Sequence, residues 1–365
     1  MINLCYEKAK DVIKQCSTKN GLFASGGIRG YDAIWARDSM ISFLGASLIQ
    51  NSLFKNTFKK SLITLTENQS ENGQIPNAVD KFSKRKPHVD YQSIDSSLWY
   101  IIGHYAYKKR YKDNSLFNKY RKAIKKALLW LKNQDTGEKG MLTQLPTSDW
   151  QDAFPHKYGY TINTQALYYN VLNLVGDKKK AERLGFMVNE NKETRLWNNV
   201  FYLPYRWKNH NKYKEMGNWF DSLGNLLAIV FGLADKQKAE KILDYIGKNK
   251  IHMPYPVKAL YPPLKKGSKD WQDYFEDCDA KEPYHYLNGG IWTFIGGFYV
   301  LSLIRLRKFE KAGIELKKLA EANLKGNFPE WIHPLTKENF GNLQAWNAGM
   351  YILAYESFKK KKCLI

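Results

Sequence analysis

Two kinds of helical segment alternate along the chain. In the first kind, apolar residues recur at intervals of three and four with lysines on the opposite side, which is typical of a helix half exposed to water. Six such segments lie at 1–16, 55–69, 115–133, 177–188, 235–247 and 308–325. In the second kind, large apolar residues occupy most positions, which indicates a helix buried on all sides. Six of these lie at 39–50, 94–107, 160–174, 221–233, 290–305 and 343–358.

This strict alternation predicts an all-α fold. Helical hairpins with one buried and one half-exposed member close most simply into a ring, with the buried helices around the axis. We therefore expect an (α/α)6 toroid or barrel of six inner and six outer helices, formed by residues 1–365 as a single domain. An open solenoid is the structural alternative, but it would show a repeated consensus, and these hairpins differ in sequence. Strand patterns are short, as at 200–206.

The connections between helices are of two kinds. Those that enter the buried helices are long and rich in Trp, Tyr, Asp, His and Asn, whereas those that leave them are short. In a ring, all the long connections open on the same end, so their polar groups converge on one cavity. The functional site is expected at that end.

The connection before the third buried helix holds two carboxylates around a tryptophan, Asp149, Trp150 and Asp152. A Trp ring stacks on the C–H face of a sugar, and an apolar neighbour raises the pKa of a carboxylic acid, so that it can donate a proton near neutrality. Asp152 is therefore the candidate proton donor. The alternative is structural, since Asp before a helix is also a common N-cap or turn residue.

The connection before the sixth buried helix holds Glu330 beside Trp331, in a loop stiffened by Pro329 and Pro334. A glycosidase needs one acid to protonate the leaving oxygen and one carboxylate to activate water. The third and sixth hairpins lie across a ring of six, which leaves room for a water between the two groups. This arrangement favours inversion, with carboxyl oxygens separated by roughly 6.5 to 9.5 Å.

Other long connections supply candidate contacts to a sugar. The side chains expected to hold hydroxyl groups are Arg37, Asp38, Asp95, His285 and Asn288, and those expected to form stacking walls are Trp35, Trp150, Trp292 and Trp331. For Arg37 and Asp38, a surface ion pair of little energetic value is the alternative. The paired glycines Gly289 and Gly290 permit a close approach of the backbone to a ligand.

A metal site is a different interpretation of one of these connections. Glu276 or Asp277, together with Cys278 and His285, contains zinc-ligating residue types. It offers one sulfur and one imidazole, at a spacing unlike that of a closed structural site. No metal and no cofactor is therefore expected.

The net charge and the composition bear on the kind of partner that the protein could bind. Lys and Arg total 57 against 35 Asp and Glu, a formal net charge of +22, which makes an acidic partner conceivable. The basic residues recur along the whole chain on the outer faces of helices, however, which is more typical of a solvated shell than of a nucleic-acid groove. A content of 44% hydrophobic and 15% aromatic residues supports a large buried core.

Features of targeting and redox chemistry favour a cytoplasmic location. The four cysteines form no CxxC pair, the first 16 residues carry charges where a signal peptide needs an apolar core, and no run of 18 apolar residues occurs. We therefore expect a reduced environment, no membrane partner and a small saccharide as the ligand.

With these motifs, the chain resembles the (α/α)6 glycoside hydrolases, specifically the alkaline/neutral invertases and the amylo-α-1,6-glucosidase (glycogen-debranching) group. The resemblance covers most of the chain and rests on five motifs in the same order. They are WARDS (35–39), similar to an Arg-Asp motif of both groups; IDSSLWY (94–100), similar to V-D-S-G-L-W; WQD (150–152), similar to W-x-D; YHYLNGGIW (284–292), similar to H-N-G-G-x-W; and PEW (329–331) followed by QAW (344–346), similar to P-E-Y and Q-T-W.

The resemblance implies roles for particular residues. It makes Asp152 the proton donor and Glu330 the base, with Asp149 a neighbour that binds substrate or sets the pKa of the acid. Gln165 lies thirteen positions after Asp152, as in the invertase segment that ends in I-Q-A-L. Further expected substrate contacts in matching segments are Gln165, Gln344 and Trp346.

One position departs from the pattern of both groups. Asn163 stands where these families usually have Glu, so one substrate contact is expected to differ. Debranching proteins of the long type also carry further domains that this sequence does not show, which favours a short saccharide over a glycogen particle.

The sequence thus predicts an inverting glycoside hydrolase that cleaves an α-glucosidic bond in a short saccharide. An alkaline/neutral invertase that hydrolyses sucrose is the alternative within the same class. A non-catalytic helical protein that binds sugar or a polyanion is the alternative from another class.

Overall fold

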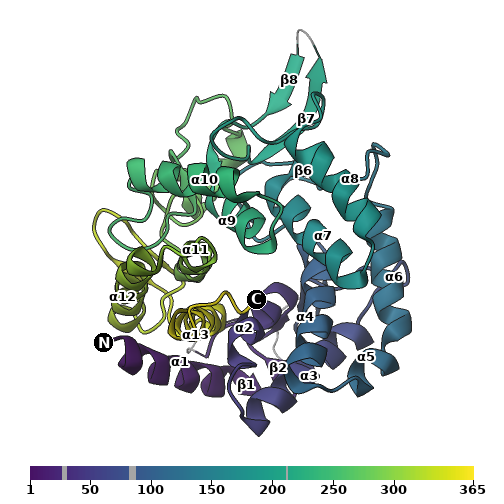
Figure 1. Cartoon of the computed structure of the whole chain (residues 1–365), viewed down its shortest axis with the longest axis vertical. Helices are drawn as coiled ribbons and strands as arrows, with labels where there is room; N and C mark the ends of the chain where they lie inside the picture. The colour runs from purple at the N-terminus through teal and green to yellow at the C-terminus, as the bar shows by residue number, and fades with distance from the viewer. Residues whose placement is uncertain (27–30, 82–87, 211–212) are drawn as a thin grey trace.

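The computed structural model describes residues 1–365 except 27–30, 82–87 and 211–212. In this described part of the chain, six inner helices surround the axis of the molecule (Figure 1). They are α2 (Ala36–Ala46), α4 (Asp95–Tyr111), α7 (Ile162–Val175), α9 (Ser222–Phe231), α11 (Thr293–Arg305) and α13 (Ala345–Lys359). Each packs against the next, and α13 packs against α2, so the ring is closed.

The outer helices jacket this ring (Figure 1). They are α1 (Ile2–Cys16), α3 (Ser52–Glu67), the short α5 (Ser115–Lys119) with α6 (Arg121–Lys132), α8 (Lys178–Asn189), α10 (Lys236–Lys248) and α12 (Phe309–Lys325). The predicted (α/α)6 barrel of six inner and six outer helices is therefore confirmed. Its closed ring excludes the open solenoid.

Helix boundaries differ from the sequence-based expectation at the starts of the inner helices. The helix expected from residue 39 begins at Ala36, so Arg37 and Asp38 belong to its first turn and not to the preceding loop. The helix expected from residue 94 begins at Asp95, which therefore also lies in a first turn. Polar residues in a first turn interrupt the apolar pattern, although the carboxylates among them also suit the positive end of the helix dipole.

Close packing at two glycines joins the first and last inner helices. A Cβ added to Gly45 in α2 would lie 1.8 Å from the carbonyl oxygen of Gly349 in α13, and one added to Gly349 would lie 2.3 Å from the carbonyl oxygen of Ser42. Only glycine permits this approach of two backbones. The two helices that close the ring are therefore in direct backbone contact.

Short antiparallel strands lie in the connections. The pairs are β1 (Ser17–Thr18) with β2 (Gly21–Leu22), β9 (Phe220–Asp221) with β10 (Leu260–Tyr261), and β11 (Trp331–Ile332) with β12 (Asn339–Phe340). The three-stranded sheets are β3 (Ile34–Trp35), β4 (Ala78–Val79) and β5 (Val89–Asp90), and β6 (Tyr160–Thr161), β7 (Tyr205–His210) and β8 (Tyr213–Met216). The strand pattern expected at 200–206 overlaps the start of β7. Two 3₁₀ helices, η1 (Asp273–Asp277) and η2 (Asp279–Lys281), complete the described elements.

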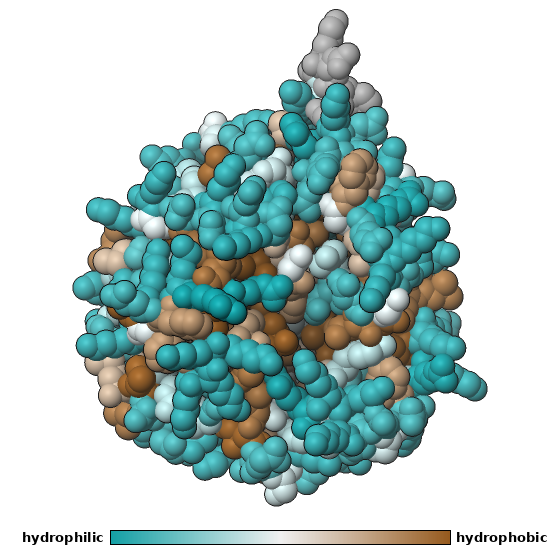
Figure 2. Space-filling model, viewed as in Figure 1, coloured by the Kyte–Doolittle hydropathy of each residue, from teal (hydrophilic) through white to brown (hydrophobic). Residues whose placement is uncertain are grey.

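One hydrophobic core runs through all the helical hairpins, from Cys5 to Ala354. Figure 2 shows hydrophilic residues over most of the periphery of one face, with apolar residues gathered toward its middle. Among the described residues, no helix has both the length and the apolar character needed to cross a bilayer. The four cysteines are free thiols, with Cys5 and Cys16 buried.

Candidate active site

A pocket lies at the end of the ring where the inner helices begin. Its walls include the first turn of α2 and the residues that cap α11 and α13. Nine of the predicted site residues line it: Trp35, Arg37, Asp38, Trp150, Asp152, Trp292, Glu330, Gln344 and Trp346. The two candidate catalytic carboxylates, Asp152 and Glu330, thus face one cavity although 178 positions separate them in the sequence.

The pocket is small, about 50 Å³. A separate and much larger cavity of about 800 Å³ contains none of these carboxylates. The small pocket is the candidate active site, because it holds the carboxylates that acid–base catalysis would require.

A cluster of aromatic rings forms one wall. Trp346 stacks on Phe294 with ring centroids 4.0 Å apart, and Trp292 packs edge-on against Trp150 and Trp346 at 5.6 and 5.8 Å. Among the described residues, the buried indole N–H groups of Trp150 and Trp346 have no hydrogen-bond partner. A buried donor without a partner is unfavourable.

Glu330 is held by two neighbouring elements. Its backbone N–H donates to the carbonyl of Phe340 at 2.7 Å, and the side chain of Asn347 in α13 donates to the carbonyl of the preceding Pro329. The hydroxyl of Tyr31 donates to Oε1 of Glu330 at 2.9 Å. Burial raises the pKa of Glu330 to about 7, an effect that the Tyr31 hydrogen bond opposes and that the charge of Asp38 reinforces.

Asp152 follows a turn whose geometry is set by Asp149. One carboxylate oxygen of Asp149 accepts the backbone N–H of Gln151 at 2.9 Å, and the other accepts the ammonium of Lys157 at 2.9 Å. The side chain of Asp152 is accessible to solvent at the pocket. The surrounding protein still removes enough water to raise its pKa, an effect that nearby Arg37 partly offsets.

Asp38 and Arg37 complete the charged part of the pocket. Burial raises the pKa of Asp38 to about 6, opposed by the guanidinium of Arg37. Nη1 of Arg37 lies 2.8 and 3.0 Å from the two carboxylate oxygens of buried Asp95 and 3.4 Å from Oγ of Ser93. The charge of Arg37 is therefore largely balanced by Asp95 behind the pocket wall.

Six predicted substrate contacts do not line the pocket. These are Asp95, Asp149, Gln165, His285, Asn288 and Trp331. For Asp95 and Asp149 the reason is electrostatic, since each is fully buried and already paired with a cation. Asp95 was expected to hold a sugar hydroxyl, and Asp149 to bind substrate or set the pKa of the acid. Neither side chain lines the pocket, and their partners show instead that Asp95 positions Arg37 and that Asp149 positions the turn before Asp152.

The other four side chains support backbone segments or neighbouring rings. Gln165 exchanges two hydrogen bonds with the backbone of Leu142, at 3.2 and 2.7 Å, and Asn288 does the same with Leu264, at 2.7 and 2.9 Å. Trp331 stacks on Phe340 with centroids 4.0 Å apart, and the His285 ring packs against Trp331 at 5.8 Å. The polar groups of Gln165 and Asn288 are therefore satisfied within the protein, and the rings of Trp331 and His285 pack against other rings.

Asn163, at the position that departs from the related families, is also buried behind the pocket. Its side-chain amide donates to Asp149 at 3.4 Å. It therefore belongs with the residues that position the turn, and it does not line the cavity.

Three lining residues were missed from the sequence: Ala24, Tyr31 and Tyr286. Tyr286 lies within the YHYLNGGIW motif, and Tyr31 lies four positions before the WARDS motif. Aromatic character close to the motif residues was the available signal. What it did not indicate was which of several adjacent aromatic side chains turns toward the cavity.

The zinc alternative has no support in the structure. Within the parts of the chain that the structure describes, no three His, Cys, Asp or Glu side chains are grouped so that they could hold a metal ion. Glu276, Asp277, Cys278 and His285 are among these described residues, and they form no such group. The ring of His285 packs against the rings of Trp331 and His333.

Solved structures with the same fold include glycosidases. A GH63 mannosylglycerate hydrolase from Thermus thermophilus, in complex with Tris and D-glycerate, covers 96% of this chain and 100% of its own, with a TM-score of 0.74 and 13% identity. The match to a glycosidase variant in complex with glucose covers 98% of this chain and 97% of the variant, with a TM-score of 0.65 and 14% identity. At these identities the likeness shows the fold.

Sequence relatives point to carbohydrate hydrolases. Neutral/alkaline invertase 1 of Oryza sativa subsp. japonica is 30% identical over 143 residues, which are 36% of this chain and 22% of the rice protein. Alkaline/neutral invertase E of Arabidopsis thaliana is 26% identical over 142 residues, 37% of this chain and 22% of that protein. The chain thus matches less than a quarter of the length of these invertases.

The family match is much broader. The model of the amylo-alpha-1,6-glucosidase family matches residues 7–349, which is nearly the whole chain and includes every residue that lines the pocket. The expected resemblance is confirmed, and the chain belongs to the amylo-alpha-1,6-glucosidase family of glycoside hydrolases.

Proposed function

We propose that this protein hydrolyses an α-glucosidic bond in a short, neutral saccharide with inversion at the anomeric carbon. The observation that carries the proposal is the shared pocket of Asp152 and Glu330, walled by tryptophan rings. A cavity with two carboxylates and aromatic faces provides the groups that glycoside hydrolysis uses.

The two carboxyl groups have complementary roles in this proposal. Protonated Asp152 donates its proton to the glycosidic oxygen as the bond to the anomeric carbon breaks. Ionised Glu330 accepts a proton from a water molecule whose oxygen forms the new bond on the opposite face of the ring. The raised pKa of Asp152 supports the first role, because it increases the protonated fraction near neutrality.

Charge at the pocket favours a neutral substrate. Three carboxylates, Asp38, Asp152 and Glu330, face the cavity against the single guanidinium of Arg37, which Asp95 already balances. An anionic aglycone such as the D-glycerate bound to the Thermus thermophilus enzyme would meet net negative charge here. We therefore expect glucosylglycerate to be a poorer substrate than a neutral disaccharide.

A substrate panel tests the proposal directly. Release of free glucose is measured from sucrose, trehalose, maltose, isomaltose, panose and glucosylglycerate. Cleavage of isomaltose or panose supports the proposal, whereas cleavage of sucrose alone supports the invertase alternative. In proton NMR of the fresh product, inversion requires that β-glucose appears before α-glucose.

Two outcomes of the panel would contradict the proposal. Initial release of α-glucose would show retention. If no saccharide is cleaved and a polyanion binds in a salt-sensitive manner, the net charge of +22 would define a binding protein instead.

The pKa of Glu330 sets an expected pH dependence. The base must be ionised, so kcat/KM should fall as the pH is lowered through about 7, the raised pKa of Glu330. Tyr31→Phe removes a hydrogen bond that favours the carboxylate. This acidic limb of the pH profile should then move to higher pH.

A matched tyrosine serves as the control for this prediction. The hydroxyl of Tyr274 lies 2.9 Å from His156 and bonds no pocket carboxylate, so Tyr274→Phe should leave the acidic limb in place. An unchanged or lowered limb in Tyr31→Phe would show that Glu330 does not control the rate as the base.

A further inference from the structure

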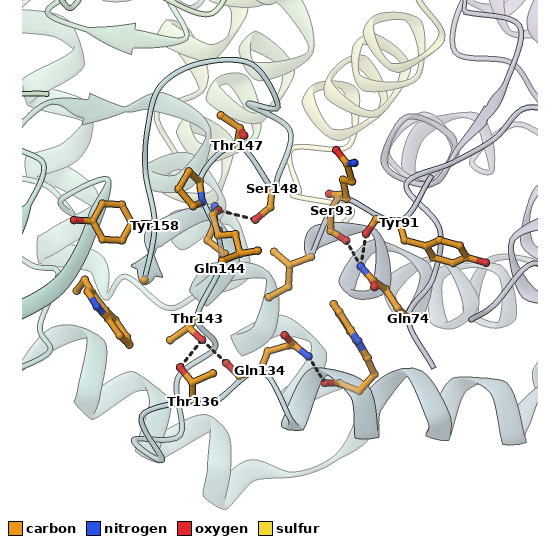
Figure 3. A pocket seen from close by; sticks show the side chains of 17 residues that line it. Gln74, Tyr91, Ser93, Gln134, Thr136, Thr143, Gln144, Thr147, Ser148 and Tyr158 are labelled. Atoms are coloured by element: carbon orange, nitrogen blue, oxygen red, sulfur yellow. Dashed lines mark hydrogen bonds between the residues drawn. The ribbon is translucent and has the colours of Figure 1, made fainter. Parts of the chain in front are cut away.

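A second cavity of about 800 Å³ opens beside the connection that enters α7 (Figure 3). We call it the outer groove. On one side it is lined by residues that precede α4, such as Tyr91 and Ser93, and on the other by the segment 143–148 and Tyr158. Since both connections enter inner helices, the outer groove opens on the same end of the ring as the catalytic pocket.

The outer groove and the catalytic pocket share a wall but no lining residue. Three consecutive residues show this separation: Ser148 lines the groove, Asp149 is fully buried and Trp150 lines the pocket. Ser93, on the groove side, lies 3.4 Å from the guanidinium of Arg37, on the pocket side. The groove is thus a separate cavity next to the catalytic carboxylates.

The chemistry of the outer groove is unusual for this protein. None of the 17 described residues that line it carries a charge, although the chain as a whole has a formal net charge of +22. A phosphate, a nucleic acid or an anionic lipid would find no cation among the lining side chains. The lining therefore selects for a neutral ligand.

Aromatic rings and amide or hydroxyl groups alternate around the groove. The rings belong to Tyr91, Trp130, Tyr158 and Trp207, and all four side chains are partly exposed. Rings of this kind present flat apolar faces to which the C–H face of a sugar can pack, and tyrosine and tryptophan also carry a polar group for hydroxyls. This combination suits a carbohydrate better than a purely apolar molecule.

Several polar groups are fixed in orientation before any ligand binds. The amide nitrogen of Gln134 donates to the carbonyl of Trp130 at 3.1 Å, and that of Gln74 donates to the carbonyl of Tyr91 (Figure 3). Each glutamine thereby keeps its Oε1 available to accept a hydrogen bond. Beside Gln134, the hydroxyls of Thr136 and Thr143 lie 3.0 Å apart and form a further polar group in the lining (Figure 3).

We propose that the outer groove is a second carbohydrate-binding site, which holds a neutral oligosaccharide of a few glucose units beside the catalytic pocket. A volume of about 800 Å³ accommodates several rings and is much larger than the pocket of about 50 Å³. The choice of glucose units rests on the proposed function; the assignment to carbohydrate rests on the groove alone. Retention of a chain here raises the local concentration of its ends at the pocket.

Binding to the outer groove is measured without turnover in the double variant Asp152→Asn, Glu330→Gln. Maltoheptaose and an isomaltooligosaccharide of the same length are titrated by calorimetry and by tryptophan fluorescence. In that background, Trp130→Ala and Trp207→Ala should each weaken binding by about tenfold, as expected for the loss of an aromatic packing face. Trp271→Ala is the matched control, because this half-buried ring packs on Phe275 and lines neither cavity.

A third variant tests the groove in case a tryptophan variant fails to fold. Thr136 is exposed at the edge of the groove, so Thr136→Arg adds bulk and charge without removing a buried side chain. It should weaken oligosaccharide binding as the tryptophan variants do. In the otherwise native enzyme, Thr136→Arg should leave kcat/KM for a one-ring aryl α-glucoside unchanged.

The outcomes separate this proposal from the proposed function. Unaltered oligosaccharide binding in Trp130→Ala, Trp207→Ala and Thr136→Arg, or no binding in the parent, would overturn the groove assignment even if the enzyme hydrolyses glucosides. Groove-dependent binding by a protein that cleaves no glucoside would leave the groove assignment standing and refute the proposed hydrolysis.

Discussion

Replacement of Asp152 by Asn is expected to lower kcat on the preferred glucoside by about 10²- to 10⁴-fold, the range typical of a general acid or base. The leaving sugar oxygen is a poor leaving group unless it is protonated, and Asn cannot supply the proton. Glu330→Gln is expected to cause a loss of similar size, because the attacking water then has no base. Both side chains line the same pocket, so neither change needs to disturb the core.

The two variants can be told apart by the leaving group. On an aryl glucoside whose phenolate leaves without protonation, Asp152→Asn should recover much of its lost activity, whereas Glu330→Gln should stay slow. Recovery by Glu330→Gln alone would mean that the two roles are reversed.

An acidic residue outside the pocket controls for a general effect of lost charge. Asp277 is exposed and does not line the cavity, so Asp277→Asn should retain activity. If Asp152→Asn and Glu330→Gln also retain near-normal activity, this pocket is not the site of hydrolysis.

The second large effect is expected at Lys157, where substitution should destabilise the fold. Its ammonium is fully buried between two fully buried carboxylates, 2.9 Å from Asp149 and 3.0 Å from Asp221. Burial alone would lower the pKa of Lys157, but the two carboxylates outweigh it and the pKa is raised. Lys157→Met leaves both carboxylates without a counter-charge, which is expected to cost about 3–5 kcal/mol of unfolding free energy.

Removal of the Lys157 ammonium should also alter the geometry of the candidate active site. Asp149 orients the turn before Asp152, and Asp221 caps α9 by accepting the N–H of Gly224 at 3.0 Å. Thermal and urea unfolding measure the stability of Lys157→Met, and glucose release measures its residual activity. We expect a lower unfolding midpoint together with reduced kcat.

An exposed lysine with a similar partner provides the comparison. Lys180 pairs with Asp177 one helical turn away, with 58% of its side chain exposed. Since surface pairs contribute less than about 1 kcal/mol, Lys180→Met should leave the unfolding midpoint nearly unchanged. Equal effects of the two substitutions would show that the buried pairs around Lys157 carry no special stability.

The ring could be predicted because its cause is local. The spacing of the apolar residues in a helix indicates whether the helix is half exposed or fully buried. The outer helix α10, for example, buries Ala239, Ile242, Leu243 and Ile246 and exposes lysines, whereas α11 buries twelve of its thirteen residues. Six such pairs have few ways to cover one another other than a closed ring.

The composition of the pocket was predicted only in part, for a reason visible at Asp149 and Asp152. Both are carboxylates of the same turn, and Trp150 lies between them. The sequence does not show that Lys157 lies beneath Asp149 and removes it from the cavity. The same difficulty arises at Asn288. From the sequence alone, an asparagine whose amide bonds the backbone of Leu264 cannot be distinguished from one whose amide binds a sugar hydroxyl.

The sequence by itself thus determined which segments are inner and outer helices, and it predicted nine side chains that line the candidate pocket. Only the tertiary structure decided which polar groups already have partners within the protein, which aromatic rings turn inward, and that a second, uncharged groove lies behind the pocket wall. The periodicity of a helix depends on neighbours three or four positions away. The satisfaction of a buried polar group depends on residues brought together from distant parts of the chain.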